Sequence, residues 1–443
     1  MFANLFEIFA VHLTCMGRYA IMPAFHKTIV LLPWNLENQT TKSLIWFTAM
    51  RKIGILIERQ RAFGRQLCSG IVKYAHTSED WTLEMLDFDD YARTSHLTKF
   101  DGFIARVIND DIAETFAKTG KPVVDVFEGC TSRPFVKVIQ NATRISQLAV
   151  RHFILHHFST FCFFGHEGMA YSDMRRKAFV ECLRLHRMGC FIYRTPASAI
   201  RNFEYNVMKK EKYSADSEER FIARWVRRLP KPIAVFASHD LRAYQLIKIC
   251  KGIGISVPSE VAVLGVDDDE ILCNFTDPTI SSIDPNAYGI GFKAAETLAV
   301  LMDGTNCPSI VRVKPTRLVE RKSTAIFPLD PPWLSDALVF IRANVRKRLS
   351  ASDVYRHVGH SHTVVNDAFR KILKTTVSKE ISNSRLNEAY RLVRTTTIPF
   401  AEISELSGFA SLQYFTRSFT AAYGKCPSQI RNAVLGGCQG ADY

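Results

Sequence analysis

Short apolar runs alternate with amphipathic segments along the chain from Met50 to about residue 325. Runs such as Ile53–Ile57, Leu83–Leu86 and Gly102–Ala105 are too short for helices and are typical of buried strands. The segment Phe63–His76, between the first two runs, carries apolar residues at helical spacing. This alternation predicts an α/β fold in which helices cover both faces of a parallel sheet.

The alternation continues and then restarts in a second half. The further predicted strands are Pro122–Val126, Thr160–Gly165, Ile233–Ala237 and Val261–Gly265, and the predicted helices are Arg144–His157 and Met174–Leu185. Two doubly wound halves in tandem are therefore expected. Ligands of such sheets lie beyond the carboxyl ends of the strands, so the expected site is the cleft between the halves.

Beyond residue 333 the pattern becomes purely helical. A first helix is expected near Trp333, and two helix-turn-helix units follow it. In the second unit Gly408 permits the tight turn, and Phe415, Phe419 and Tyr423 recur at four-residue spacing to anchor the next helix. The opposite face of that helix is left free for a DNA major groove.

The second unit resembles the AraC family of transcription regulators. From Gly408 to Phe419 the chain reads G-F-A-S-L-Q-Y-F-T-R-S-F, and Gly424-Lys425-Cys426-Pro427 follows. The first unit fits the same pattern but departs from it at three positions. His360 stands where an apolar residue is usual, Ala368 where arginine is common, and Lys374 where glycine often closes the helix.

We expect two recognition helices that enter successive major grooves, about 34 Å apart. The expected base-reading residues are His362, Thr363 and Asn366 in the first unit and Ser411, Leu412, Gln413 and Thr416 in the second. Gln413 could pair bidentately with adenine. Arg417 is expected to contact phosphate or to make a contact within the domain.

Residues 50–325 resemble the sugar sensors of the LacI and periplasmic-binding-protein superfamily. The matching stretches are Ala234–Asp240, Gly254–Val261, Leu264–Asp269 and Asp277–Ile283. Joined to an AraC-type reader, the chain from Met50 onward is similar to the xylose operon regulator family. The resemblance implies a two-lobed, periplasmic-binding-protein-like (type I) α/β sensor followed by an all-α double helix-turn-helix domain.

The resemblance also suggests ligand-binding residues. Asp267 follows a core strand where the superfamily commonly uses a carboxylate for sugar hydroxyls, and Arg175 begins an Arg-x-x-small-Phe pattern whose arginine reaches the ligand. His239, which replaces a usual asparagine, and Asp240 after it are also expected to bind the ligand. Phe63 could stack on a sugar ring or cap the first helix as a core aromatic. Arg65 follows Gly64, which stands at a position that is acidic in the characterised type.

Composition and charge agree with a DNA-binding regulator. The net charge is +14, and residues 330–443 hold 15 Lys/Arg against 9 Asp/Glu, which suits a phosphate backbone. The eleven cysteines form no C-x-x-C pair and indicate a reduced, cytosolic chain. No cofactor is predicted. Ser172 lacks a G-x-S-x-G elbow, so catalysis is not expected.

Metal binding is not predicted, although histidines and acids cluster. His152, His156 and His157, and again His357, His360 and His362, lack a third ligand type at suitable spacing in the sequence. The acidic run Asp267–Asp269 has no spaced glutamate and is a poor calcium loop.

The expected domain boundaries follow from these patterns. Residues 1–49 are an extension, from an upstream start or poorly ordered; 50–325 form the sensor, 326–332 a proline-rich linker, 333–433 the reader and 434–443 a tail. The expected partners are an operator in double-stranded DNA, a small sugar effector, a second copy in a homodimer, and RNA polymerase for an activator. No membrane contact is expected, and the expected location is the cytoplasm, at the nucleoid.

The resemblance and the motifs together predict a sugar-responsive, sequence-specific DNA-binding transcription regulator that activates pentose (xylose-like) catabolic genes. Two other classes of protein remain open. One is a solute-binding receptor whose C-terminal helices form a protein-interaction module. The other is a sugar-acting enzyme that binds DNA for autoregulation. The absence of a clear signal peptide and the basic reader argue against the first, and a test for turnover of pentoses and their phosphates would detect the second.

Overall fold

The computed structural model describes residues 19–23, 29–33, 50–78, 80–87, 94–129, 133–194 and 215–435. The chain divides into two compact units, which are Met1–Gln140 with Asn286–Val313, and Asn141–Pro285 with Lys314–Tyr443. Most of the expected extension 1–49 and tail 434–443 lies outside the described residues. Within the extension, β1 (Tyr19–Pro23) pairs antiparallel with β2 (Ile29–Pro33).

The first unit is built on a six-stranded parallel sheet of order β13-β7-β6-β5-β3-β4. Its strands are β3 (Arg51–Leu56), β4 (Trp81–Met85), β5 (Gly102–Ala105), β6 (Val123–Asp125), β7 (Val136–Gln140) and β13 (Ile310–Val313). Its helices are α2 (Ala62–Ser78), α3 (Thr94–Leu97), α4 (Asp110–Lys118) and α12 (Ala287–Met302). The central strands are buried on both faces, which explains their continuous apolar runs.

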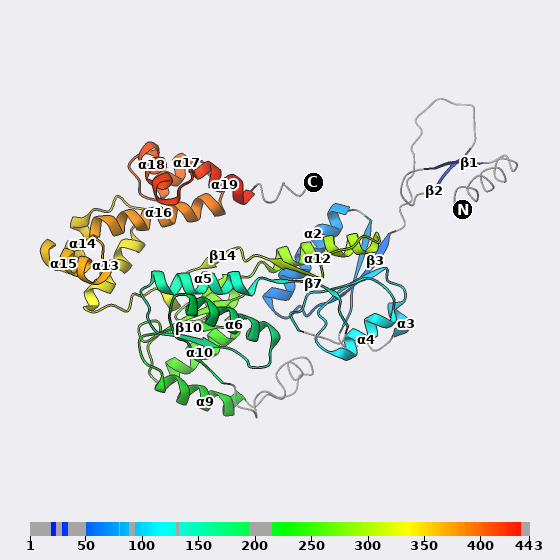
Figure 1. Cartoon of the computed structure of the whole chain (residues 1–443), viewed down its shortest axis with the longest axis horizontal. Coiled ribbons are helices and arrows are strands. Elements are labelled where there is room, and N and C mark those ends of the chain that lie inside the picture. The colour runs from blue at the N-terminus through cyan, green and yellow to red at the C-terminus, as the bar shows by residue number, and fades with distance from the viewer. Residues whose placement is uncertain are drawn as a thin grey trace. The chain divides into compact units, whose positions relative to one another are not determined.

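Two helices of the first unit pack in backbone contact, as Figure 1 shows for α2 and α12. A Cβ added at Gly70 would lie 2.0 Å from the Tyr288 carbonyl oxygen, and one at Gly291 would lie 1.9 Å from that of Leu67. No other residue type fits these positions without a shift of backbone. The two glycines therefore set the distance between the helices.

The second unit begins with a six-stranded sheet of order β14-β12-β11-β10-β8-β9. Its strands are β8 (Phe161–Phe164), β9 (Phe191–Ile192), β10 (Ile233–Ala237), β11 (Val261–Val266), β12 (Ser281–Asp284) and β14 (Arg317–Val319), of which β14 alone is antiparallel. The helices around it are α5 (Ala142–Leu155), α6 (Ala170–Leu185), α9 (Ala215–Arg228), α10 (Asp240–Gly252) and α11 (Glu270–Phe275). Alternate residues of its strands feed two apolar cores, with Val235 and Val263 on one face and Phe236 and Leu264 on the other.

The predicted α/β fold and most of the predicted elements are confirmed, but a strictly tandem arrangement of the halves is wrong. The segment Asn286–Val313 returns to the first unit, where α12 covers the sheet and β13 pairs with β7. Local hydrophobic pattern identifies a strand but does not say which sheet receives it. Each half of the sensor is consequently assembled from separate stretches of chain.

The remainder of the second unit is helical and forms the reader. It contains α13 (Pro332–Ala343), α14 (Ala351–Val358), α15 (His362–Leu373), α16 (Val377–Thr395), α17 (Phe400–Leu406), α18 (Leu412–Tyr423) and α19 (Pro427–Leu435). Two apolar cores support it, one around Phe369 and one around Phe415 and Phe419. Ser350 and Asp353 form a reciprocal capping box at the start of α14. The predicted double helix-turn-helix is confirmed.

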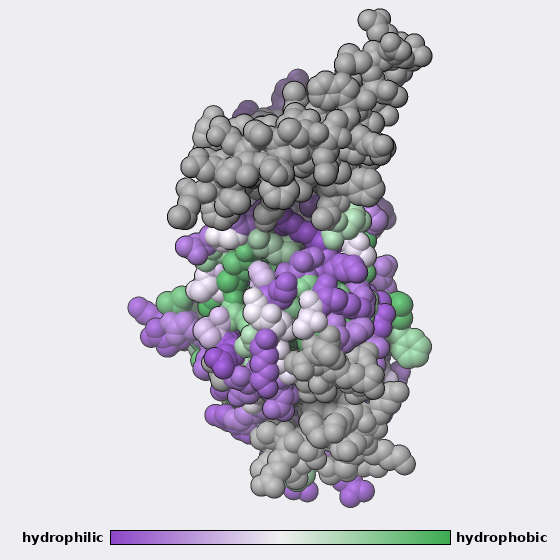
Figure 2. Space-filling view, turned by 90° about the vertical axis from the view of Figure 1, so that its right-hand side faces the viewer, coloured by the Kyte–Doolittle hydropathy of each residue, from purple (hydrophilic) through white to green (hydrophobic). Residues whose placement is uncertain are grey.

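The described surface in Figure 2 is largely hydrophilic, with smaller apolar patches. Within the described part of the chain, no helix combines the length and apolar character needed to cross a bilayer.

Candidate functional site

The carboxyl end of β11 opens into an acidic turn with unusual backbone angles. Asp267 has φ of 116° and Asp268 has φ of 46°, in the region that side chains other than glycine rarely adopt. Asp268 is fixed by Arg321, whose Nη2 lies 2.8 Å from its carboxylate. Backbone strain of this kind is concentrated at ligand-binding positions. The turn thus holds Asp267 at the edge of the sheet where ligands of such folds bind.

Arg175 meets this turn from α6. Its side chain is buried, its Nη1 donates to the Ser238 carbonyl oxygen, and its Nη2 lies 3.8 Å from Asp267 Oδ1. Its guanidinium also lies 5.7 Å from the centre of the Tyr171 ring. The structure therefore brings together two of the predicted ligand residues, which are far apart in sequence.

His239 lies beside them as the N-cap of α10. Its Nδ1 accepts a hydrogen bond from the Arg242 backbone N–H at 3.2 Å. The centres of the His166 and Tyr171 rings each lie 5.8 Å from that of His239. His239 is 4% exposed, and it packs against the same Tyr171 ring that the Arg175 guanidinium contacts.

Asp240, which was also predicted to bind the ligand, is buried beside the acidic turn. The residue is 1% exposed, and its carboxylate accepts hydrogen bonds from Ser282 Oγ at 2.5 Å and from the Asp269 backbone N–H at 2.9 Å. Burial and the nearby charge of Asp267 raise the pKa of Asp240 well above its usual value. Asp240 fixes the acidic turn by accepting the hydrogen bond from the Asp269 backbone N–H.

Two buried hydroxyl groups near Arg175 were missed by the sequence reasoning. Ser172 is 1% exposed and Ser238 is fully buried, and neither Oγ has a hydrogen-bond partner among the described residues. A buried polar atom without a partner is costly unless a ligand or water satisfies it. Ser172 lies one turn before Arg175 on α6, and Ser238 follows β10 directly.

The first unit places Phe63 and Arg65 at the start of α2. Phe63 packs against the apolar core, which is the structural alternative considered for it, and Arg65 Nη1 donates to the Gln60 carbonyl oxygen at 2.9 Å. A Cβ at Gly64 would lie 1.8 Å from the Glu58 carbonyl oxygen. The close turn between β3 and α2 therefore excludes an acidic side chain at this position.

The first unit also carries charges that the sequence reasoning missed. Glu58 lies two residues after β3 and Arg106 directly after β5, and they form an ion pair with side chains 25% and 21% exposed. The Arg106 guanidinium lies 4.9 Å from the centre of the Phe127 ring. A charged residue within two positions of the end of a buried strand was the feature of the sequence that could have identified both residues.

In the reader, α15 and α18 present exposed N-terminal turns. His362 and Thr363 are exposed on α15, as are Ser411, Leu412, Gln413 and Arg417 on α18, while Thr416 is half-buried. Ser361 and Ser411 cap these helices by accepting hydrogen bonds from Val364 N and Tyr414 N. The Arg417 guanidinium lies 5.7 Å from the centre of the Tyr414 ring. Most predicted base-reading residues are therefore accessible.

Asn366, also predicted to read bases, is buried. The residue is 7% exposed, and its Nδ2 donates to the Tyr355 hydroxyl at 2.8 Å and to the His362 carbonyl oxygen at 3.1 Å. The amide faces α14 and joins the two helices of the first helix-turn-helix unit.

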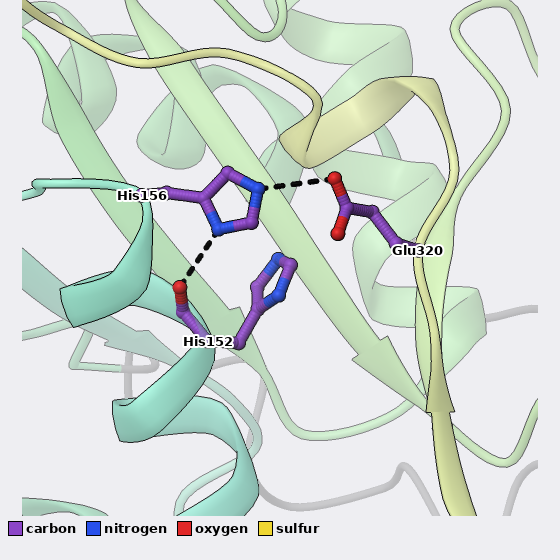
Figure 3. A group of neighbouring side chains, drawn as sticks. All are labelled: His152, His156 and Glu320. Atoms are coloured by element: carbon purple, nitrogen blue, oxygen red, sulfur yellow. Dashed lines mark hydrogen bonds and ion pairs between the residues drawn. The ribbon is translucent and has the colours of Figure 1, made fainter. Parts of the chain in front are cut away.

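A third group of residues lies where the reader's first helix meets the sensor lobe of the second unit. His152 and His156 lie one turn apart on α5, and Glu320 follows β14 and faces His156, as Figure 3 shows. His156 Nε2 lies 3.0 Å from Glu320 Oε1, and its Nδ1 donates to the His152 carbonyl oxygen at 2.8 Å. Sequence reasoning missed Glu320 because it is 164 residues from His156.

Arg342 of α13 completes this junction. It donates through Nη1 to His156 Nε2 at 2.8 Å and through Nη2 to the Leu155 carbonyl oxygen at 3.1 Å. Its guanidinium lies 4.4 Å from the centre of the Phe327 ring, which stacks on His156 at 5.1 Å. Burial raises the pKa of Glu320, but the hydrogen bond and charge of His156 outweigh it and lower the pKa to about 2.

Known proteins resemble this chain in both of its parts. A periplasmic binding protein-like domain family matches residues 150–324, and a helix-turn-helix domain family matches residues 354–433. The xylose operon regulatory protein of Escherichia coli K12 is 26% identical over 397 residues, covering 87% of this chain and 98% of that protein. The solved structure of the xylose-binding transcription activator XylR covers 87% of this chain and 99% of its own at 25% identity, with a TM-score of 0.54.

The chain is a XylR-like transcription regulator. This XylR-like regulator is also similar to the HTH-type transcriptional activator AarP of Providencia stuartii. The two are 33% identical over 103 residues, which cover 23% of this chain and 76% of AarP. The assignment confirms the prediction of a sugar-responsive, DNA-binding transcription regulator. The curated relatives are regulators of transcription and not enzymes.

Proposed function

We propose that this XylR-like regulator binds a pentose of the xylose class and activates genes of pentose catabolism. The proposal rests on the pair formed by Arg175 on α6 and Asp267 on the strained turn. Arg175 Nη2 lies 3.8 Å from Asp267 Oδ1. A guanidinium and a carboxylate together offer several donors and two acceptor oxygens, which suits adjacent sugar hydroxyls. The names of the curated relatives support the same ligand class.

Further groups complete the proposed ligand wall of the second unit. The buried hydroxyls of Ser172 and Ser238 gain hydrogen-bond partners when a polyol binds beside Arg175. His239 replaces the amide that is usual in the superfamily and contributes to the choice of sugar. On the first unit, Arg65 stays a proposed ligand residue, and the Glu58–Arg106 pair lies, like Arg65, near the carboxyl end of a strand.

The ligand assignment is tested by thermal unfolding of the full chain with pentoses, hexoses, deoxy sugars and uronic acids at millimolar concentration. A ligand bound only by the native state raises the midpoint by mass action. We expect a selective shift with one pentose, which Asp267→Asn abolishes. The matched control is Asp277→Asn, because the Asp277 side chain is 82% exposed and its ion pair is with Lys251. No shift with any sugar, or equal loss in both variants, would contradict the proposal.

We propose that the exposed turns of α15 and α18 enter two successive major grooves of an operator. Gln413 is exposed on the first turn of α18 and is the proposed adenine reader. Replacing Gln413 by alanine should cost roughly 1–3 kcal/mol at one base position. Binding isotherms on an operator selected from random DNA, and on unselected DNA, measure this.

The two DNA substrates distinguish base reading from backbone contact. Loss on the selected operator alone supports base reading by Gln413. Equal loss on both DNAs would assign the residue to the phosphate backbone. Lys371→Ala, which removes an exposed charge from α15, serves as the comparison. Loss of a charge that contacts phosphate should lower affinity for both DNAs equally.

Assembly and location belong to the same proposal. We infer a homodimer that acts in the cytoplasm, at the nucleoid, and that recruits RNA polymerase when the sugar is bound. A sugar that binds one conformation better than another shifts the population toward it, and the shift changes how the readers meet DNA. Sedimentation with and without sugar, and transcription from the selected operator with purified polymerase, test these parts separately.

A further inference from the structure

The junction between α5, β14 and α13 contains a donor set with no assigned role. One nitrogen of each imidazole of His152 and His156 and one carboxylate oxygen of Glu320 all lie within 4.8 Å of one another. Two histidines and one glutamate are a ligand set that zinc commonly takes. The two histidines are four residues apart on one helix, so both rings face the same side (Figure 3).

One hydrogen bond of the site suits metal binding. The Nδ1 of His156 donates to the His152 carbonyl oxygen, which leaves Nε2 directed toward Glu320. A backbone carbonyl on the second nitrogen is a common support for a metal-binding histidine.

The Arg342 guanidinium already contacts this donor set. Its Nη1 lies 2.8 Å from His156 Nε2 and 3.9 Å from Glu320 Oε1, and His156 Nε2 lies 3.0 Å from the same carboxylate oxygen. The guanidinium therefore stands where an ion bound by these side chains would contact them.

We propose that His152, His156 and Glu320 bind a transition-metal ion of the zinc class, in competition with the Arg342 guanidinium. Donor atoms around a tetrahedral zinc lie about 3.4 Å apart at bond lengths of about 2.1 Å, so the side chains close on the ion by small rotations. The ion takes the lone pair of His156 Nε2 that Arg342 now uses. Metal binding and the Arg342 contact therefore exclude each other.

The ion has a route from solvent. A cavity of about 1280 Å³ reaches His152, His156, Glu320 and Arg342. Arg151, Arg317 and Arg321 also line it, and their positive charge opposes a divalent cation. We therefore expect micromolar and not nanomolar affinity.

The position of the site gives metal binding a consequence for the reader. Arg342 lies on the first helix of the reader, and it contacts the sensor lobe through His156 and the Leu155 carbonyl oxygen. A metal that displaces Arg342 removes both contacts and loosens α13 from the lobe. The proposal is independent of which sugar the sensor binds.

The test titrates Co²⁺ and then Zn²⁺ into the full chain after removal of metal with a chelator. We expect visible d–d absorption from a nitrogen and oxygen site, without the near-ultraviolet bands of thiolate ligation. His156→Gln and Glu320→Gln should each lower the cobalt affinity at least tenfold, and Arg342→Leu should raise it severalfold. His186→Gln, at an exposed histidine, should change nothing.

Several outcomes would overturn the proposal. They are the absence of cobalt absorption, thiolate bands alone, and an affinity that neither His156→Gln nor Glu320→Gln changes. An Arg342→Leu variant with unchanged or weaker affinity would contradict the competition. Circular dichroism of each variant separates loss of ligand from loss of fold. Zinc should also change operator affinity severalfold in the parent chain and leave the His156→Gln variant unaffected.

Discussion

Asp125 lies at the carboxyl end of β6 with its side chain fully buried. Its Oδ2 lies 2.8 Å from Lys137 Nζ, and its Oδ1 accepts from the backbone N–H groups of Val107 and Phe127. Burial outweighs these favourable contacts and raises the pKa of Asp125 to about 6. The carboxylate joins the segments that follow β5 and β6 to strand β7, and the stability of this connection depends on pH.

The raised pKa predicts a specific dependence of stability on pH. The native state binds this proton more tightly than the unfolded chain, whose carboxyl pKa is 3.8. The contribution to the free energy of unfolding is therefore complete below pH 3.8 and is lost as pH rises through about 6. Its size is roughly 3 kcal/mol.

Asp125→Asn should remove this component, because an amide does not titrate. The difference in unfolding free energy between parent and variant, measured in urea from pH 4 to pH 7, should change by a large part of that amount. Asp277→Asn serves as the exposed control. Parallel pH curves for the parent and Asp125→Asn would show that the carboxyl group titrates normally.

At the scale of elements, the two recognition helices end in the same way with different residues. Lys374 closes α15 with φ of 56°, and Gly424 closes α18 with φ of 68°. A residue with a Cβ is strained in this left-handed conformation, whereas glycine is not. The departure seen in the sequence at Lys374 therefore has a measurable cost.

Lys374→Gly should raise the free energy of unfolding by about 1 kcal/mol, and Gly424→Lys should lower it by a similar amount. Nothing lies within 4 Å of a Cβ built at Gly424, so the effect there is conformational and not steric. Thermal unfolding of each single variant, and of the variant that carries both substitutions, measures the two changes in the free energy of unfolding. Destabilisation by Lys374→Gly would mean that the hydrogen bond from Lys374 Nζ to the Lys371 carbonyl oxygen matters more than the strain.

The elements were largely predictable from sequence, and the orientation of single side chains was not. The run Ile233–Ala237 is β10 at its predicted bounds, because a buried strand must be apolar throughout. Asn366 could not be placed, since its direction is set by the hydroxyl of Tyr355 on another helix. Glu320 joined the histidines only through the pairing of β14 with β12, which no local pattern records.

At the scale of the whole molecule, Phe327 contacts both the reader and the sensor lobe of the second unit. Its ring is 2% exposed, packs in the first core of the reader, and stacks on His156 of the sensor lobe. The expected proline-rich linker, residues 326–332, therefore contains a buried aromatic residue, Phe327. The reader's first helix begins five residues after it, at Pro332.

Phe327→Ala should destabilise the second unit by roughly 3–5 kcal/mol and separate the unfolding of reader and sensor lobe. Denaturation followed by far-ultraviolet circular dichroism and by calorimetry should then show two transitions in place of one. Phe340→Ala, in the same reader core and stacked on His357, should lower stability without splitting the transition. A single transition for Phe327→Ala would show that other contacts couple the two parts.

The return of Asn286–Val313 to the first unit has a consequence during synthesis. When residue 140 leaves the ribosome, the sheet of that unit lacks β13, and the glycine contacts of α2 with α12 cannot form. At typical translation rates the missing stretch follows roughly ten to thirty seconds later. In that interval the nascent chain exposes the edge of β7 and the apolar side of α2, so the early half of the sensor is where a holding chaperone has the most to bind.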